Sequence, residues 1–209
     1  VVDAKAGKGV DSLITQLDKK KETKQTDAQY KRENPLFSLL QLNVQQGQLI
    51  ASPAVGIVNK RDTATVAKYL NSRQVKEVLP RDVLFRWTVK SLDKKGNFFQ
   101  LIAIKVTNRD GKAPLAGDAV TDARDDISQY SAYSNVSMTM NPEGAKTWAR
   151  LTKENIGRSI AIILDDMVYS YPNVNTEITG GRSEITGNFT PEEAKDLANV
   201  LKSGRMPAP

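Results

Sequence analysis

The chain has 209 residues, 39% of them hydrophobic and 26% charged, proportions that are ordinary for a globular protein with one or two domains. Cysteine and histidine are both absent, which excludes disulfides, thiol catalysis, histidine triads and histidine metal sites. The formal net charge is +6, and much of the basic excess lies in residues 5–32, without an aromatic platform. We therefore expect solvated lysines and no nucleic-acid partner.

Residues 1–52 show little pattern and are expected to be a flexible or helical linker or insert. Apolar residues recur at helical spacing in residues 10–17, but residues 18–32 are polar throughout. A short apolar cluster after Pro35 predicts a helical turn that docks on the main body. No run approaches the roughly 18 apolar residues that a membrane span needs. We expect the chain to be a segment of a longer protein.

Residues 53–112 are predicted to form a small α+β subdomain. A short strand over 55–58 is followed by a helix with Asp62 as its cap and with Val66 and Leu70 on its buried face. Residues 83–89 alternate as a strand, and a turn at 94–97 returns the chain into a partner strand over 98–106. Trp87 lies on the apolar face of its strand, which predicts a core residue.

Residues 113–206 are predicted to contain two similar strand–helix units. In the first, Val136, Met138 and Met140 alternate as a strand, and Asn141 caps a helix whose first residue is Pro142. In the second, a strand over 183–186 precedes a capping box formed by Thr190 and Glu193. Gly157 and Gly204 are expected to end the two helices.

Between these units, residues 159–164 and 167–171 predict two strands joined by a turn at Asp165 and Asp166. Aspartate at position 166 tolerates the left-handed conformation of such a turn less well than glycine but better than most residues. Residues 118–129 fit either a helix or an extended segment. The predicted fold class is α+β: split strand–helix units pack on an antiparallel or mixed sheet in a ferredoxin-like head, preceded by a smaller α/β segment.

Four motifs stand out in this part of the chain: V-S-M-T-M-N-P-E-G-A-K from Val136, L-D-D-M-V-Y-S-Y-P from Leu164, G-G-R-S-E-I-T-G-N-F-T from Gly180 and L-K-S-G-R-M-P-A-P from Leu201. Together they resemble the periplasmic head of the SecD and SecDF family, membrane-embedded accessory proteins of the Sec translocase. The family usually has glycine at position 166. The resemblance is continuous over residues 113–209 and partial over 53–110, and the family's base signature is missing.

The resemblance implies a protein-export factor of the bacterial inner membrane, with this segment facing the periplasm. It implies partners as well: an unfolded preprotein, and, through the membrane part, the Sec channel and a SecF-type protein. In the family, proton flow through the membrane part is coupled to movement of the head. No enzymatic activity, catalytic residue, metal or cofactor is expected, and the segment itself should be monomeric.

Flexible or amphipathic side chains near strand edges and turns favour a surface that accepts many sequences. The predicted preprotein contacts are Met138, Met140, Met167, Tyr169 and Tyr171, with Tyr130 and Tyr133 as further members of the same surface. For each of these residues, an ordinary position in the core is an equally good interpretation of strand alternation.

Other functional interpretations are weaker. Asp165 and Asp166, with Asp122, Asp125 and Asp126, lack the spacing of a calcium loop, so a turn and a solvated acidic edge are favoured. Gly180 and Gly181 fit a hairpin turn better than an anion cradle. The alternative to the export function is an envelope-anchored structural module that binds glycan or cell wall, and a hydrolase is disfavoured.

Overall fold

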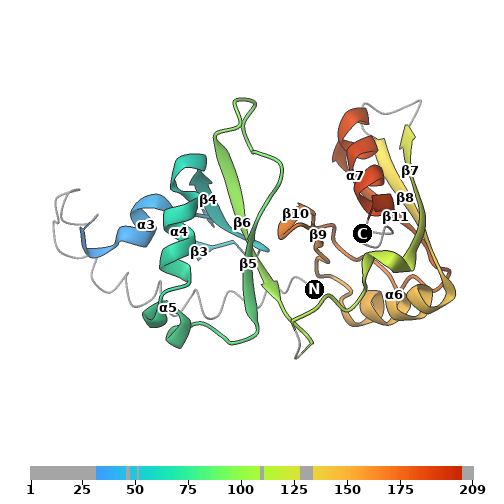
Figure 1. Ribbon diagram of the computed structural model, residues 1–209, viewed down its shortest axis with the longest axis horizontal. Coiled ribbons are helices and arrows are strands. Elements are labelled where there is room, and N and C mark those ends of the chain that lie inside the picture. Colours follow the sequence, from blue (N-terminus) through green and yellow to red (C-terminus); the bar gives the residue numbers. More distant parts are fainter. Residues whose placement is uncertain (1–31, 46–47, 51, 109–110, 128–133, 204–209) are drawn as a thin grey trace. The chain divides into compact units, whose positions relative to one another are not determined.

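The computed structural model describes residues 32–45, 48–50, 52–108, 111–127 and 134–203. They fall into two compact units (Figure 1). The N-terminal unit comprises the residues up to Lys105 together with Asp166–Val168, and the C-terminal unit comprises Val106–Asp165 and the residues from Tyr169 onward. The sequence predicts a boundary at 112/113, whereas the contacts divide the chain at 105/106 and assign three later residues to the first unit.

The N-terminal unit is built on a four-stranded antiparallel sheet in the order β1-β4-β6-β5. Short helices and a small hairpin accompany it. The elements are α3 (Pro35–Leu39), β1 (Gln41–Leu42), β2 (Val44–Gln45), β3 (Gln48–Leu49), β4 (Ala54–Asn59), η2 (Lys60–Asp62), α4 (Thr63–Leu70), α5 (Arg73–Val78), β5 (Val83–Trp87) and β6 (Phe98–Lys105). Part of the predicted linker, from α3 to β3, thus has regular structure.

The core of the N-terminal unit forms where α3 and α4 pack on the sheet. Val58 and Leu101 are 1% exposed and Val66 of α4 is fully buried beside them. Trp87 packs against this cluster, as its alternation predicts. Burying three such side chains contributes several kcal/mol, at about 1.5–3 kcal/mol each.

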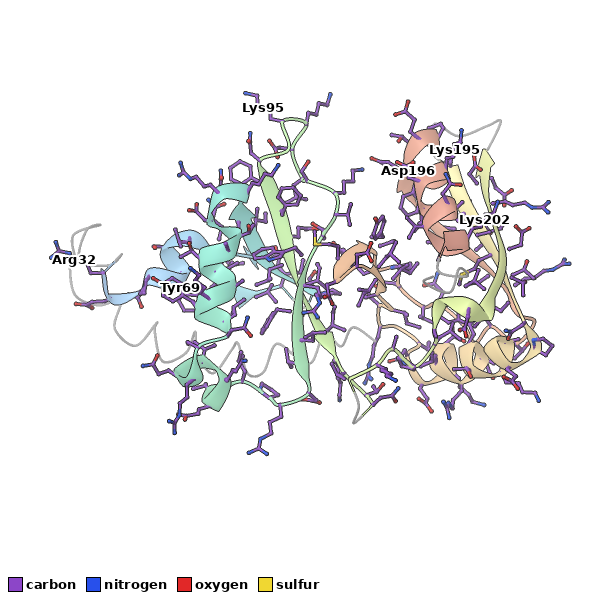
Figure 2. All side chains as sticks on the ribbon, viewed as in Figure 1. Arg32, Tyr69, Lys95, Lys195, Asp196 and Lys202 are labelled. Carbon is purple, nitrogen blue, oxygen red and sulfur yellow. The ribbon has the colours of Figure 1, made fainter. Side chains whose placement is uncertain are left out.

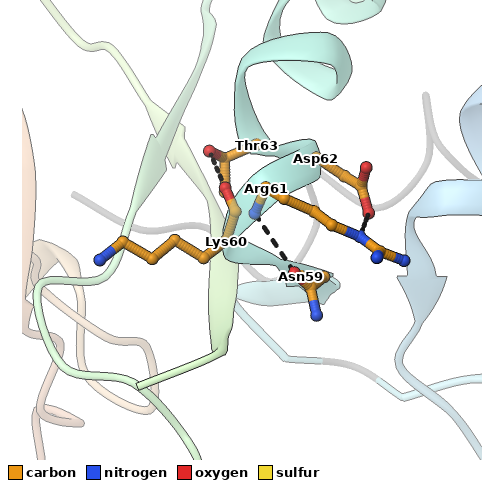
Figure 3. A network of polar contacts seen from close by, with 5 residues as sticks. All are labelled: Asn59, Lys60, Arg61, Asp62 and Thr63. Atoms are coloured by element: carbon orange, nitrogen blue, oxygen red, sulfur yellow. Dashed lines mark hydrogen bonds and ion pairs between the residues drawn. The ribbon is translucent and has the colours of Figure 1, made fainter. Parts of the chain in front are cut away.

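The predicted cap at Asp62 is wrong in its detail. The oxygen Oδ1 of Asn59 accepts the N–H of Arg61 at 3.2 Å, so Asn59 caps the 3-10 turn that leads into α4 (Figure 3). Asp62 makes no side-chain cap hydrogen bond; its carboxylate pairs with Arg61 Nε at 3.4 Å. The cap moved three residues upstream because a turn of 3-10 helix precedes the α-helix, which the apolar spacing alone does not reveal.

The C-terminal unit contains a three-stranded antiparallel sheet in the order β11-β8-β7. A separate two-stranded β9-β10 hairpin also begins and ends in this unit, but its residues Asp166–Val168 are assigned to the N-terminal unit. The elements are η3 (Gly117–Ala119), β7 (Val120–Ile127), β8 (Ser134–Met140), α6 (Pro142–Glu154), β9 (Ile162–Leu164), β10 (Met167–Ser170), β11 (Arg182–Phe189) and α7 (Pro191–Ser203). The ambiguous segment 118–129 is therefore a strand over Val120–Ile127, and its last two residues lie outside the described residues. The predicted strand 159–164 shortens to β9. The α+β class is confirmed.

One face of this sheet carries the core, and both helices contribute to it. Every second residue of β8, from Ser134 to Met140, is buried. Trp148 and Leu151 of α6 join the same cluster, as do the small and aliphatic residues of α7. Figure 2 labels Lys195 and Asp196 on the exposed side of α7, opposite its buried residues Ala194, Leu197 and Ala198.

The predicted helix caps of the C-terminal unit are confirmed. Asn141 Oδ1 accepts the N–H of Gly144 at 2.7 Å. In the capping box, Thr190 N–H donates to Glu193 Oε2 at 3.0 Å and Glu193 N–H donates to Thr190 Oγ1 at 3.3 Å. Each device satisfies backbone donors that the first helical turn leaves without partners. None of the described helices is both long enough and apolar enough to cross a membrane.

Two glycines of this unit have similar backbone angles but different surroundings. Gly181 has a φ of +67°, and a Cβ there would lie 2.8 Å from Ala145 Cβ; its carbonyl accepts the N–H of Met140 at 2.8 Å. Gly157 has a φ of +75° and nothing within 4 Å of a built Cβ. Gly181 therefore serves close packing of β11 against α6, not the anion cradle that its sequence could also fit.

The pair allows backbone strain to be separated from steric overlap. We expect Gly157→Ala to lower the free energy of unfolding by about 1–2 kcal/mol through the left-handed backbone alone. Gly181→Ala should lower the free energy of unfolding by about 1–3 kcal/mol more than Gly157→Ala does, because Ala145 must also move. Urea denaturation of both variants measures the difference, and equal losses would contradict the packing role of Gly181.

Asp93 organises the turn between β5 and β6. Its Oδ1 accepts the N–H groups of Asn97 at 2.8 Å and Phe98 at 2.9 Å. Desolvation acts to raise the pKa of this carboxyl, but the backbone N–H donors, Phe98 first among them, outweigh it and hold the pKa below the ordinary 3.8.

The lowered pKa of Asp93 makes the turn pH-dependent with a defined sign. Because the folded pKa lies below the unfolded one, the carboxylate stabilises the fold above pH 3.8 and this contribution is lost as the pH falls through the folded pKa. We expect Asp93→Asn to be less stable than the parent near pH 7 and the difference to shrink below pH 3.8. Thermal unfolding at a series of pH values tests this, and a difference that grows with acid would refute it.

Candidate functional site

The C-terminal unit contains a cavity of about 330 Å³, which we call the head groove. Its lining comes from the inner face of β8, from α6, from the segment 172–178 and from β11. The lining residues are Met138, Trp148, Thr152, Ile160, Ile162, Pro172, Asn173, Val174, Asn175, Thr176, Ile178, Arg182, Ser183, Glu184, Ile185 and Thr186. The cavity is thus an apolar floor with a polar rim, the composition expected of a binding site.

The head groove runs along an outer strand of the sheet. Five consecutive residues of β11, Arg182–Thr186, line it, those facing the core and those facing solvent alike. β11 pairs with β8 on one side only, because the sheet order is β11-β8-β7. The backbone of an outer strand carries N–H and C=O groups that are available to an added chain.

The opposite wall of the head groove is an extended segment tied to the loop after α6. Val174 exchanges backbone hydrogen bonds with its neighbours, donating to Arg158 O and accepting from Gly157 N–H, both at 2.8 Å. Ile160 N–H donates to Pro172 O at 3.1 Å, and the Ser159 hydroxyl hydrogen-bonds Asn173 Oδ1. These contacts hold the wall in one place without drawing it into a sheet with β11.

Thr152 fastens the wall to α6 from inside. It is fully buried, its hydroxyl donates to the carbonyl of Trp148 at 2.8 Å, and it accepts the N–H of Ile178 at 3.0 Å. A buried backbone N–H without a partner is costly, so this one hydroxyl fixes the position of Ile178.

The floor contains an unsatisfied donor. Trp148 is 9% exposed, and among the described residues its Nε1–H is the buried side-chain polar atom that has no hydrogen-bond partner. Buried indole N–H groups usually find an acceptor. The buried indole N–H of Trp148 thus remains without a partner inside the core of the C-terminal unit.

The structure places two of the expected contact residues in the core. Met138 and Met140 are 5% and 7% exposed and belong to the core cluster. Both point to the inner face of β8, because strand alternation places them with Val136 and not with the solvent-facing residues. Met138 still lines the floor of the head groove, whereas Met140 is not among its lining residues.

The other expected contacts lie on β10 and just after it. Met167, Tyr169 and Tyr171 are each half-buried, and Tyr169 packs against the core of the C-terminal unit. Met167 is assigned to the N-terminal unit, and Tyr169 and Tyr171 are assigned to the C-terminal unit. Tyr130 and Tyr133 lie outside the described residues.

Two groups of acidic residues can be compared with their predicted roles. Asp165 and Asp166 both adopt left-handed backbone conformations, with φ of 48° and 62°, and form the turn of the β9-β10 hairpin as predicted. Asp122 pairs with Arg124 Nε at 2.8 Å and with Lys202 Nζ at 3.8 Å. Within the described ranges, no cluster of three acidic residues could hold a metal ion.

Sequence reasoning missed most of the head groove. Residues 172–178 have no periodicity. The one available signal is a hydroxyl at a position of α6 that the helical spacing buries, because a buried polar side chain needs a hydrogen-bond partner.

The fold and the head groove define the class of the C-terminal unit: an α+β subdomain with an apolar groove along an outer strand. The sequence model of the family described as "SecDF, P1 head subdomain" matches residues 99–208. The chain therefore belongs to the SecDF P1 head subdomain family.

Two relatives illustrate the match. The chain is 42% identical over 179 residues to the protein translocase subunit SecD of Rhodothermus marinus, which covers 84% of this chain and 27% of that protein. It is 42% identical over 99 residues to the protein translocase subunit SecDF of Thermus thermophilus, covering 47% of this chain and 13% of the relative. The chain thus spans 27% or less of these relatives.

Solved SecDF structures are also similar to the chain. One, described as a membrane component that enhances protein export, has a TM-score of 0.40 and 28% identity and covers 88% of this chain and 72% of that one. Another, the crystal structure of a translocon-associated SecDF from Thermus thermophilus, has a TM-score of 0.44 and 25% identity over 85% of this chain and 26% of that chain.

The role of Thr152 can be tested by an isosteric change. Thr152→Val keeps the shape of the side chain but leaves the N–H of Ile178 without an acceptor, so we expect a loss of about 1–3 kcal/mol in unfolding free energy. Thr186→Val on exposed β11 is the matched control and should stay within about 0.5 kcal/mol of the parent. Similar losses in both variants would contradict the fastening role.

Proposed function

We propose that this chain is the head-containing part of a SecD-type protein-export factor and that its head groove binds translocating polypeptide in an extended form. The observation that carries the proposal is the apolar cavity along the outer strand β11. An extended chain placed there can use the strand edge for main-chain hydrogen bonds and the floor for side chains.

The side chains of the head groove are suited to binding polypeptides of many different sequences. Its floor combines Met138, a flexible and polarisable side chain, with Trp148 and Ile185. Main-chain recognition at a strand edge does not depend on side-chain identity. The cavity has a volume of about 330 Å³, which accommodates only a few side chains at once. Binding should therefore be weak and promiscuous, which a factor that must release its substrate requires.

Membership of the SecDF family supports the wider setting. We infer a periplasmic position for the chain, a Sec channel and a SecF-type protein as partners through a membrane part, and a working cycle driven by the proton-motive force. No described residue is assigned a role in proton transfer. The contribution of this chain is reversible contact with the substrate.

Site-specific photo-crosslinking tests the proposal directly. A photoreactive residue at Thr186, on the rim of the head groove, should capture a secretory polypeptide arrested in transit in the full-length protein, and Tyr171 should do so to a lesser extent. Asp196, exposed on α7 and not part of the lining, is the matched control position and should give few adducts.

An independent readout uses the indole N–H of Trp148. The sequence has two tryptophans, so a labelled sample gives two indole N–H signals, and Trp148→Phe identifies the one from the floor. Adding an unfolded secretory polypeptide should shift that signal. Adducts that are equally frequent at Asp196 and Thr186, or an unmoved Trp148 signal, would overturn the assignment of the head groove.

A further inference from the structure

The N-terminal unit has a cleft of its own, which we call the β5 cleft. It has a volume of about 410 Å³ and lies between the α4–α5 pair and β5. Its walls are apolar, with Leu70, Leu79, Phe85 and Trp87 among the lining residues, all of them half-buried. β5 is the outer strand of the sheet, so this cleft also lies at a strand edge.

The charges around the β5 cleft are all positive. Lys76, Arg81 and Arg86 line it, and no acidic residue does. Arg86 is engaged, because its Nη2 and Nε bind Asp166 Oδ1 at 2.7 and 3.1 Å. Lys76 and Arg81 are exposed and form no ion pair with any residue in the described part of the chain. The rim therefore offers two cations to an outside anion.

Just beyond the end of β5, the outer side of the chain already pairs with β10. The N–H of Val89 donates to the carbonyl of Val168 at 2.9 Å, and Thr88 and Val168 form a parallel bridge. Thr88 N–H instead donates to Gln100 O, toward β6, at 3.0 Å. Since alternate residues point to opposite sides, the N–H of Phe85 points outward with that of Val89, and it has no partner among the described residues.

We propose that the β5 cleft is a second polypeptide-binding site, which takes an extended segment with an apolar side chain beside an acidic one. The segment lies along β5 in line with Val168, its backbone accepts the N–H of Phe85, its apolar side chain enters the cleft, and its carboxylate meets Lys76 and Arg81. Its source is the translocating polypeptide, so the inference rests on the proposed function. It adds a second point of contact and a preference for acidic segments.

Fluorescence anisotropy with defined peptides tests the second site on the whole chain. The probe is a labelled ten-residue peptide of alternating leucine and threonine with glutamate at both ends, and its partner carries lysine at those ends. The double variant Lys76→Glu/Arg81→Glu should weaken binding of the acidic peptide about five- to tenfold and strengthen binding of the basic one. Lys68→Glu, exposed on α4 outside the lining, should change neither by more than about twofold.

A second arm tests the main-chain contact. The same acidic peptide methylated on alternate backbone nitrogens cannot pair along a strand, and one of the two methylation registers should bind more weakly than the parent peptide. Thermal unfolding of the double variant should match that of the parent, because both side chains are exposed and unpaired.

The outcomes separate the two proposals. Failure of the acidic peptide to bind, or unchanged affinity in the double variant, overturns the second site even if crosslinks at Thr186 persist. Loss of crosslinks at Thr186, with charge-dependent peptide binding retained, leaves the second site standing as a peptide site and refutes the proposed function of the head groove.

Discussion

The inner face of β8 is the constraint on which the C-terminal unit depends. One strand with alternate residues buried receives β7 and β11 at its two edges and α6 and α7 on one side. The same face supplies Met138 to the floor of the head groove. Packing and binding surface thus share a strand, and a change in the volume of Met138 should act on both. The groove persists because Thr152 holds one wall and hydrogen bonding to β8 holds the other.

How much the sequence predicts depends on how local the cause is. The caps at Asn141 and Thr190 and the Asp165–Asp166 turn depend on residues three or four apart, and the structure confirms them. Asp62 failed as a cap because an unforeseen 3-10 turn moved the helix start. Strand alternation had already placed Met138 and Met140 with Val136, and their interpretation as surface contacts gave chemistry more weight than geometry.

The head groove and the β5 cleft could not be predicted, for a different reason. Each depends on segments far apart in the chain: Thr152 meets Ile178, and β5 meets Val168. The periodicity of apolar residues in the sequence does not indicate such long-range contacts. What the two sites share is an outer strand beside an apolar floor, so the chain repeats one physical solution in two units of different topology. The difference lies at the rim, which is mixed and polar in the head groove and cationic at the β5 cleft.

The assignment of Asp166–Val168 to the N-terminal unit has a consequence for the order of folding. Arg86 and Asp166 are 80 positions apart, so a growing chain has made all of β5 and β6 long before their last neighbour exists. Closing so long a loop is slow relative to forming the local hairpin. Vectorial synthesis therefore leaves the end of β5 without this neighbour until residues 166–168 have been made. The N-terminal unit is completed by three residues from within the sequence of the C-terminal unit, although each unit has its own core.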